Sequence, residues 1–241
     1  MESADGRREG IAQEVEVINM IDKKKAVIFD LDGTLVNSMW VWHDIDIEYL
    51  GRYGYDVPED MVQEIEGMGF TEVAVYFKER FRIPDEIETI KEEWNRMAFE
   101  KYATVVPLKP GVAGFLEKIH VAGMKVGIAS SNSRELIMAC LKNHRIDGYF
   151  DCITTACDVA KGKPSPDIYL HVAKALGVKP EECLVFEDVP MGILAGKNAG
   201  MQVCAIEDEH SADQREEKRR LADFYIRSYD EIGEGTYEVL S

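Results

Sequence analysis

Short apolar runs alternate with amphipathic stretches through the second half of the chain. The runs predict buried strands, and the stretches, with apolar residues at helical spacing, predict helices. The predicted strands are Ala26–Phe29, Lys125–Ala129, Cys152–Thr154, Cys183–Phe186 and Gln202–Ile206. The predicted helices lie near Val112–Ala122, Ser133–Asn143, Pro166–Leu176 and Met191–Ala199. Because strands and helices alternate, we predict an α/β fold with a doubly wound parallel sheet.

The pattern changes between residues 40 and 101. Asp, Glu and Lys alternate there with apolar residues at helical spacing, as from Ile45 to Tyr49, and no strand-like run occurs. This stretch predicts a small helical bundle inserted into the α/β fold. We therefore expect three parts, which are an N-terminal tail (1–24), an α/β core (25–40 and 107–236) and a helical insertion (41–106).

Composition narrows the class of protein. The 241 residues suffice for one large domain, or for one domain carrying a small insertion. The formal net charge of -17 disfavours nucleic acid and anionic membranes as partners. The five cysteines form no C-x-x-C pair, which argues against a disulfide framework or a zinc site. No apolar run reaches transmembrane length and no signal-peptide core is found, so we expect a soluble cytoplasmic protein.

Polar residues gather where the predicted strands end. They are Asp30 and Asp32 after the first strand, Ser130, Ser131 and Asn132 after the second, Lys163 in a later loop, and Glu187 and Asp188 after the fourth. Parallel strands bring their carboxyl ends to one edge of the sheet, where ligands bind. Neighbouring carboxylates destabilise each other unless a cation lies between them. The acidic strand ends therefore suit a hard cation, most simply Mg²⁺. Together with Lys163, this ion would supply the positive charge that a phosphate needs in an acidic protein.

The same residues carry a family resemblance. Asp30–Leu35 with Ser38, the Ser130 segment, Lys163 within Gly162–Asp167, and Glu187-Asp188 resemble, in order, the four motifs of the haloacid dehalogenase superfamily. The match is to its phosphatase and phosphomutase branch with a helical cap. It implies a Rossmann-like core with an inserted all-helical cap domain. It also implies a monomeric, Mg²⁺-dependent phosphatase that acts on a small phosphorylated metabolite such as a sugar phosphate.

The resemblance also implies a role for each site residue. Asp30 attacks phosphorus and forms an aspartyl-phosphate, while Asp32 protonates the leaving oxygen and then takes a proton from the attacking water. Lys163 neutralises Asp30 and the phosphoryl group. Ser130 and the backbone N–H of Ser131 hold phosphoryl oxygens. The implied Mg²⁺ ligands are Asp30, the main-chain carbonyl of Asp32, Asp188, and Glu187 directly or through water.

Two points stay open at this level. Asn132 either contacts the substrate or caps the following helix, since it precedes Glu135 by three residues. In the cap, Trp42 and His43 follow the first motif closely, and Phe70 ends the Gly-rich segment from Gly67; each is a candidate for substrate contact. The alternative for the cap aromatics, Trp42 among them, is a place in the helical core.

The same residues distinguish a phosphatase from three alternative functions. β-Phosphoglucomutase shares the four motifs but carries a basic residue in the cap loop that binds the second phosphate of its substrate. The matching position here is Gly69-Phe70, with no base until Lys78, which favours a phosphatase. The dehalogenases of the superfamily need no second acid, so Asp32 argues against that reaction. A non-catalytic relative would be expected to lack Asp30 or Lys163, and both are present.

Overall fold

The computed structural model describes residues 20–65, 68 and 70–240. Seven strands form one sheet in the order β3-β2-β1-β4-β5-β6-β7, parallel except for the last pair. The strands are β1 (Ala26–Phe29), β2 (Lys125–Ser130), β3 (Cys152–Thr155), β4 (Cys183–Glu187), β5 (Gln202–Ile206), β6 (Phe224–Ile226) and β7 (Glu238–Val239). The strand order reverses between β1 and β4, which makes their carboxyl ends the switch point of the sheet.

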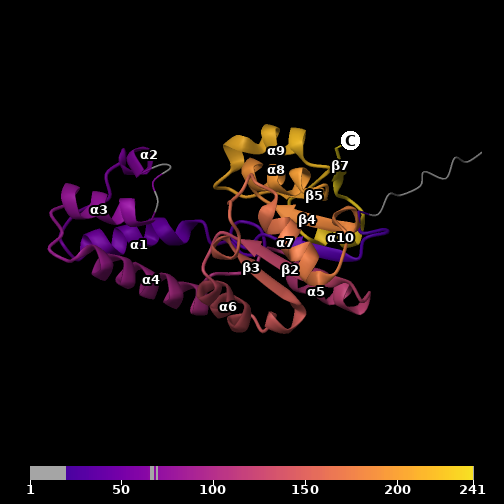
Figure 1. The fold of residues 1–241 in the computed structure, drawn as a ribbon. Coiled ribbons are helices and arrows are strands. Elements are labelled where there is room, and N and C mark those ends of the chain that lie inside the picture. Colours follow the sequence, from indigo (N-terminus) through magenta and orange to yellow (C-terminus); the bar gives the residue numbers. More distant parts are fainter. Residues whose placement is uncertain (1–19, 66–67, 69, 241) are drawn as a thin grey trace, which may run out of the picture.

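Helices surround the sheet and extend beyond one end of it (Figure 1). Those that alternate with the strands are α5 (Val112–Val121), α6 (Arg134–Asn143), α7 (Asp167–Leu176), α8 (Pro190–Asn198), α9 (Arg215–Leu221) and α10 (Asp230–Glu234). Those between β1 and α5 are α1 (Trp40–Gly51), α2 (Met61–Ile65), α3 (Phe70–Arg80) and α4 (Ile87–Thr104). We call this second group the cap helices.

The two faces of the sheet bury different residues because side chains alternate along a strand. On β1, Val27 and Phe29 belong to the core under α5 and α6, whereas Ala26 and Ile28 face α7 and α8. All four are fully buried. A strand buried on both faces has no polar positions of its own, so polar groups can appear only where it ends.

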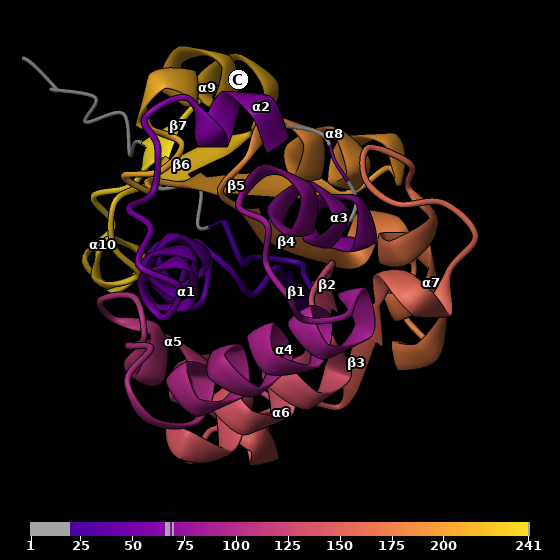
Figure 2. The same cartoon turned by 90° about the vertical axis from the view of Figure 1, so that its left-hand side faces the viewer.

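The cap helices lie beyond the carboxyl ends of the strands, and they come nearest to the viewer in Figure 2. The two chain segments that connect them to the core pair with each other, since Asn37 N donates to the carbonyl oxygen of Pro107 at 3.0 Å. Helix α4 also packs against α6. The cap helices therefore cover the sheet edge at which the polar residues converge.

The α/β fold and its five predicted strands are confirmed, and the structure places no strand among the described cap residues. The pattern had not indicated β6 and β7, which are three and two residues long and too short to show a period. Residues 1–19 of the predicted tail lie outside the described residues. The boundaries of the three parts stay a prediction. Within the described ranges, no helix combines the length and apolarity needed to cross a bilayer.

An aromatic cluster beneath the end of β1 should dominate the stability of the core. Phe29 stacks on Phe186 with ring centroids 5.2 Å apart and meets the edges of Phe115 and Phe150 at 6.2 and 6.4 Å. Phe29→Ala should lower the free energy of unfolding by about 3–5 kcal/mol, because it leaves a cavity at this contact. Chemical denaturation measures the change. The control is Phe99→Ala on α4, where the ring is 47% exposed and the expected loss is below about 0.5 kcal/mol. Equal losses in the two variants would contradict the assignment.

Candidate active site

The candidate site occupies the carboxyl ends of the three central strands. Asp30 directly follows β1, Ser130 is the last residue of β2, and Glu187 is the last residue of β4 with Asp188 next to it. Backbone pairing fixes the registers, with Phe29 opposite both Ile128 and Phe186. Residues distant in sequence are thus brought together by the sheet itself.

Three acids and one ammonium form the centre of the site. Asp30, Glu187 and Asp188 each offer a carboxylate oxygen within 4.8 Å of the others, and all three are buried. Lys163 Nζ donates to Asp30 Oδ1 at 2.6 Å and to Glu187 Oε1 at 2.5 Å. Tyr169 donates its hydroxyl to the same oxygen of Glu187. One ammonium therefore bridges two of the acids and leaves the cluster with an excess of negative charge.

Burial opposes ionisation of Asp30 and Asp188. It raises the pKa of Asp30 well above its usual value, which Lys163 partly offsets, and it raises that of Asp188 to about 7, with Glu187 adding to the effect. Burial also acts to lower the pKa of Lys163, but Asp30 and Glu187 outweigh it and hold this pKa above its usual range. Lys163 thus stays charged, and the acids favour the approach of a further cation.

Glycine makes room for these carboxylates at two positions. Gly33 has a φ of 75°, and a Cβ there would lie 2.2 Å from Asp188 Oδ2. A Cβ on Gly192, in α8, would lie 2.1 and 2.2 Å from the two oxygens of Glu187. Thr34 donates to Asp188 Oδ1 at 3.0 Å, whereas Oδ2 accepts no hydrogen bond from any described residue. One oxygen of Asp188 is thus available to a ligand.

Asp32 lies outside the buried group of acids. Its Oδ1 accepts from Ser38 at 2.6 Å and from the Tyr102 hydroxyl, and its Oδ2 accepts from Asn132 Nδ2 at 3.1 Å. Asp30 and Asp32 would share a face if the strand continued, but β1 ends at Phe29 and the chain turns there. Asp32 instead lines a cavity of about 240 Å³ together with Ser38, Met39, Trp42, Tyr102, Ser131 and Asn132.

The segment after β2 contributes to the same region. Ser130 is buried and accepts from the backbone N–H of Asn132 at 3.0 Å, while Ser131 is exposed. The alternative that Asn132 caps the next helix is wrong. Ser133 is the N-cap of α6, and its Oγ accepts from Leu136 N at 3.3 Å. The side-chain amide of Asn132 therefore does not cap α6, and its Nδ2 donates to Asp32.

The candidate cap residues lie in different places. Trp42 faces the cavity that contains Asp32, and its ring meets that of Phe70 at 5.8 Å. Both side chains are 38% exposed, so Trp42 is not part of the helical core. His43 lines a separate cavity of about 390 Å³ with Ile47, Gly51, Tyr55, Asp56 and Val57. Gly67 and Gly69 lie outside the described residues.

Three residues that hydrogen-bond to site residues, directly or through Ser211, were not predicted from the sequence. Tyr102 lies on α4 at helical spacing from buried Trp94 and Ala98, so its position is typical of a core residue. Tyr169 likewise lies on the buried face of α7. Lys218 is fully buried and donates to Ser211 Oγ at 3.0 Å, and Ser211 donates to the main-chain oxygen of Asp188 at 2.8 Å. Lys218 stands among charged residues, as an exposed lysine would, so the sequence does not indicate that it is buried.

The chain is similar to known proteins over most of its length. Residues 27–206 match the model of the haloacid dehalogenase-like hydrolase family. The chain is 35% identical over 185 residues to the bifunctional riboflavin kinase/FMN phosphatase of Arabidopsis thaliana, which covers 75% of this chain but 48% of that protein. It is 30% identical over 178 residues to the phosphorylated carbohydrates phosphatase of Thermotoga maritima, covering 74% of this chain and 82% of that protein.

A solved structure shows the same fold. β-Phosphoglucomutase of Clostridium difficile superposes with a TM-score of 0.67 at 24% identity, over 88% of this chain and 97% of that one. The family model spans most of the chain, and the four motifs lie together at one sheet edge. The resemblance drawn from the motifs is confirmed: the chain belongs to the haloacid dehalogenase-like hydrolase family, in its phosphatase and phosphomutase branch.

Proposed function

We propose that this hydrolase releases phosphate from a small phosphorylated metabolite, a sugar phosphate or a similar monoester, through an aspartyl-phosphate on Asp30. The observation that carries the proposal is the ammonium of Lys163, whose side chain is 10% exposed, between Asp30 and Glu187. It holds one oxygen of Asp30 and leaves the other without a described hydrogen-bond partner. A buried carboxylate held in this way is a nucleophile that needs no activating base.

The donor set fits a divalent metal, most simply Mg²⁺. The group offers carboxylate oxygens alone, carries excess negative charge, and leaves an oxygen of Asp188 unengaged beside Gly33. We propose Asp30, Asp188 and the main-chain carbonyl of Asp32 as the ligands. Glu187 already accepts from Lys163 and Tyr169 at one oxygen and from Asp188 N at the other, which supports a contact through water. When bound, the ion would neutralise charge on the phosphoryl group.

The chain's own residues account for the transfer step. The unengaged oxygen of Asp30 forms a bond to phosphorus as the bond from phosphorus to the leaving oxygen breaks. The ammonium of Lys163, the hydroxyl of Ser130 and the backbone N–H of Ser131 stabilise the charge on the phosphoryl oxygens. These groups come from rigid strand ends and an ion-paired loop, so little reorganisation is needed during the reaction.

Asp32 is proposed as the acid and base. It donates a proton to the leaving oxygen and later accepts one from the water that cleaves the aspartyl-phosphate. Ser38, Tyr102 and Asn132 together hold both of its oxygens, and Tyr102 comes from a cap helix. We propose that residues 41–106 act as one cap domain and that this contact connects its position to that of Asp32. Small motions of the cap would then move the proton donor.

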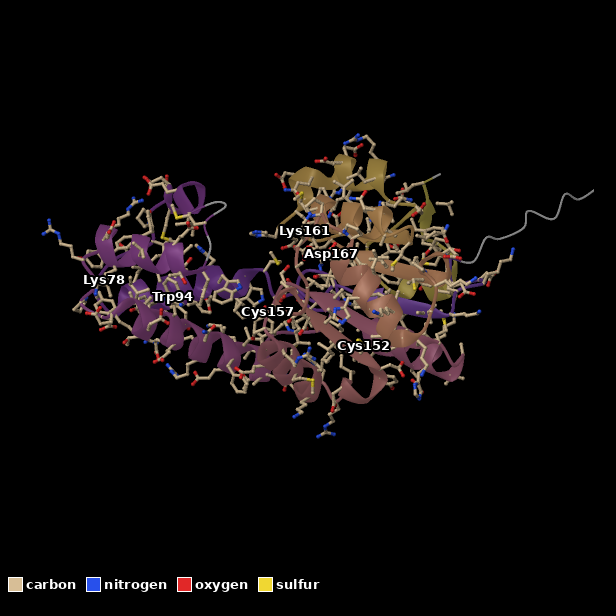
Figure 3. The ribbon with its side chains drawn as sticks, in the orientation of Figure 1. Lys78, Trp94, Cys152, Cys157, Lys161 and Asp167 are labelled. Atoms are coloured by element: carbon tan, nitrogen blue, oxygen red, sulfur yellow. The ribbon has the colours of Figure 1, made fainter. Side chains whose placement is uncertain are left out.

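A phosphomutase is the second candidate, because β-phosphoglucomutase shares the fold. A mutase must also bind the distal phosphate of a sugar bisphosphate, which calls for a cation in the cap. Lys78, the nearest base after Phe70, lies at the end of the cap away from the core (Figure 3). Its Nζ donates to the main-chain oxygen of Asp85 at 2.6 Å. The described residues that line the cavity at Asp32 include no Lys, Arg or His. These features favour hydrolysis.

The first test of this function compares the same substitution at Lys163 and at its neighbour Lys161. Lys163→Met should reduce phosphate release from acetyl phosphate by about a thousandfold, since it removes a charge aimed at the phosphoryl group. Lys161→Met, at an exposed position two residues earlier, should leave the rate unchanged. Asp30→Asn should reduce release to background. Circular dichroism checks that each variant folds. A folded Lys163→Met or Asp30→Asn enzyme with near-normal turnover would rule out the proposed mechanism.

The second prediction concerns metal and pH. The folded-state pKa of Asp188, about 7, exceeds the usual 3.8, so the stability that this group contributes is present below 3.8 and is lost as pH rises through 7. Between pH 5.5 and 8 the metal-free protein should lose this contribution, and Mg²⁺ should restore more at pH 8. At a hundred times its Kd the gain is about 2.7 kcal/mol. Melting with and without Mg²⁺ measures it.

Asp188→Asn is the control for the metal experiment. It should abolish most of the stabilisation by Mg²⁺, since one proposed ligand loses its charge. Ca²⁺, which prefers more ligands at longer distances, should bind without supporting turnover. Equal stabilisation of the parent protein and Asp188→Asn by Mg²⁺ would contradict the assignment.

The third prediction separates the two candidate reactions. With β-glucose 1-phosphate and a bisphosphate primer, glucose 6-phosphate should form more slowly than inorganic phosphate, because nothing in the described cavity holds a second dianion. Coupled assays for the two products measure both rates in one sample. Isomerisation faster than hydrolysis would establish the phosphomutase instead.

A further inference from the structure

Asp188 is the one acid of the buried cluster that Lys163 does not bind. The ammonium of Lys163 forms ion pairs with the other two acids. Asp188 is instead held by two hydroxyl groups. Thr34 donates to its Oδ1 at 3.0 Å, and Ser211 Oγ donates to its main-chain oxygen at 2.8 Å. The position of Asp188 therefore depends in part on the chain that follows β5.

The loop formed by residues 207–211 follows β5 and is held by a buried ion pair. Lys109 Nζ donates to Asp208 Oδ2 at 2.5 Å, and Asp208 Oδ1 accepts from the backbone N–H of His210 at 2.9 Å. Both side chains of the ion pair are buried. Ser211, at the end of the loop, is 2% exposed, so its hydroxyl lies away from bulk water.

Lys218, on α9, binds the same hydroxyl group. Its side chain is fully buried, and its Nζ donates to Ser211 Oγ at 3.0 Å and to the main-chain oxygen of Ile206 at 3.2 Å. No described residue forms an ion pair with this ammonium. Helix α9 packs on α8, which begins two residues after Asp188 (Figure 1). A second ammonium is thus enclosed close to the acid cluster, with two uncharged acceptors.

A buried ammonium without an ion pair is costly to the fold. Burial lowers the pKa of Lys218, and the charges of Glu207, Asp188 and Asp208 oppose this shift. A methionine side chain of similar length would fill the position without the cost of removing a charge from water. Packing alone therefore does not account for a lysine here. Of its two hydrogen bonds, the one to Ser211 leads on to a residue of the candidate site.

The chemistry of the two side chains sets the direction of both hydrogen bonds. An ammonium has three N–H donors and no acceptor, so the hydroxyl of Ser211 must accept from Lys218. A serine hydroxyl has a single proton, which is then directed to the main-chain oxygen of Asp188. A charged donor on the hydroxyl oxygen also polarises the O–H group and strengthens the bond that it donates. Lys218 thus acts on Asp188 through one hydroxyl.

We propose that Lys218 and Ser211 are positioning residues, which fix the backbone of Asp188 and so direct its unengaged carboxylate oxygen toward a bound Mg²⁺. This inference rests on the proposed function, in which Asp188 is a metal ligand. The carbonyl group that Ser211 binds belongs to the peptide directly after the Asp188 Cα, so holding it limits rotation of the residue. Thr34 holds one carboxylate oxygen, and the other is left for the ion. Groups that orient a metal ligand in this way contribute about 10–100-fold to affinity.

Three possible roles of Lys218 differ in what they predict for Mg²⁺ binding. A positioning role predicts weaker binding when either the ammonium or the hydroxyl is removed. A purely electrostatic role predicts tighter binding by Lys218→Met, because a positive charge near the acids is lost, and no change for Ser211→Ala. A purely structural role predicts a lower melting temperature with an unchanged Kd.

Titration of the parent protein and the variants with Mg²⁺ in a calorimeter measures the Kd. Ser211→Ala and Lys218→Met should each raise it about tenfold. The double variant should raise it by about the same factor, because the two substitutions break one connected pair of hydrogen bonds. With acetyl phosphate, the Mg²⁺ concentration for half-maximal rate should rise by this factor, while kcat at saturating Mg²⁺ stays within about twofold of the parent value.

The matched controls remove the same groups elsewhere in the core. Ser228→Ala removes a hydroxyl that donates to the main-chain oxygen of Pro110 at 3.2 Å. Lys197→Met removes an ammonium that pairs with Asp223 at 2.7 Å. Neither side chain hydrogen-bonds to the acid cluster in the described part of the chain. Both controls should therefore leave the Kd for Mg²⁺ unchanged.

The outcomes separate this inference from the proposed function. No Mg²⁺ binding by the parent protein would overturn the proposed metal site, and no release from acetyl phosphate would overturn the proposed phosphatase. Binding by the parent with an unchanged Kd in Ser211→Ala would overturn the positioning role alone, and so would tighter binding by Lys218→Met. An effect of about a hundredfold in the double variant would show that the two residues act independently and overturn their connection. Ser211→Ala decides the question by itself if Lys218→Met does not fold.

Discussion

An ammonium held between two buried carboxylates is the interaction on which this structure depends. The chain carries a net charge of -17 and still brings Asp30, Glu187 and Asp188 within 4.8 Å of one another. Lys163 makes this possible by binding two of the three acids. It compensates only part of their charge. The same ion pairs that hold the strand ends together therefore leave an excess of negative charge at the site, which favours the approach of a further cation.

The core holds this charge cluster in place. Phe29 and Phe186 stack directly beneath the ends of β1 and β4, and Tyr229 packs on both and donates to the carbonyl oxygen of Thr34. Thr34 in turn binds Asp188. The aromatic packing beneath the strand ends is thus connected to Asp188 through the hydrogen bonds of Tyr229 and Thr34. Such rigidity suits a reaction whose catalysis is mostly positioning and fixed charge.

The core and the cap helices differ in the side chains that line their cavities. Under the proposed function, Lys163 and backbone N–H groups of the core would meet a dianion, whereas the described lining of the cavity at Trp42, Asp46 and Trp94 consists of aromatic and aliphatic side chains and one acid. Tyr102 links the two parts, because it extends from α4 to Asp32. Under the proposed mechanism, a movement of the cap would therefore affect proton transfer at Asp32 through one side chain.

The sequence by itself determined the α/β class, the five principal strands, the helical insertion and the four groups of polar residues at the strand ends. These features depend on local periodicity and on the rule that parallel strands share a carboxyl edge. Only the tertiary structure decided that Asp32 turns to Ser38, Tyr102 and Asn132. Asp32 and Tyr102 are 70 residues apart. A tyrosine or tryptophan on the buried face of a helix has the same pattern whether it fills a core or serves a site, because the partner of its polar atom is set by packing between distant segments.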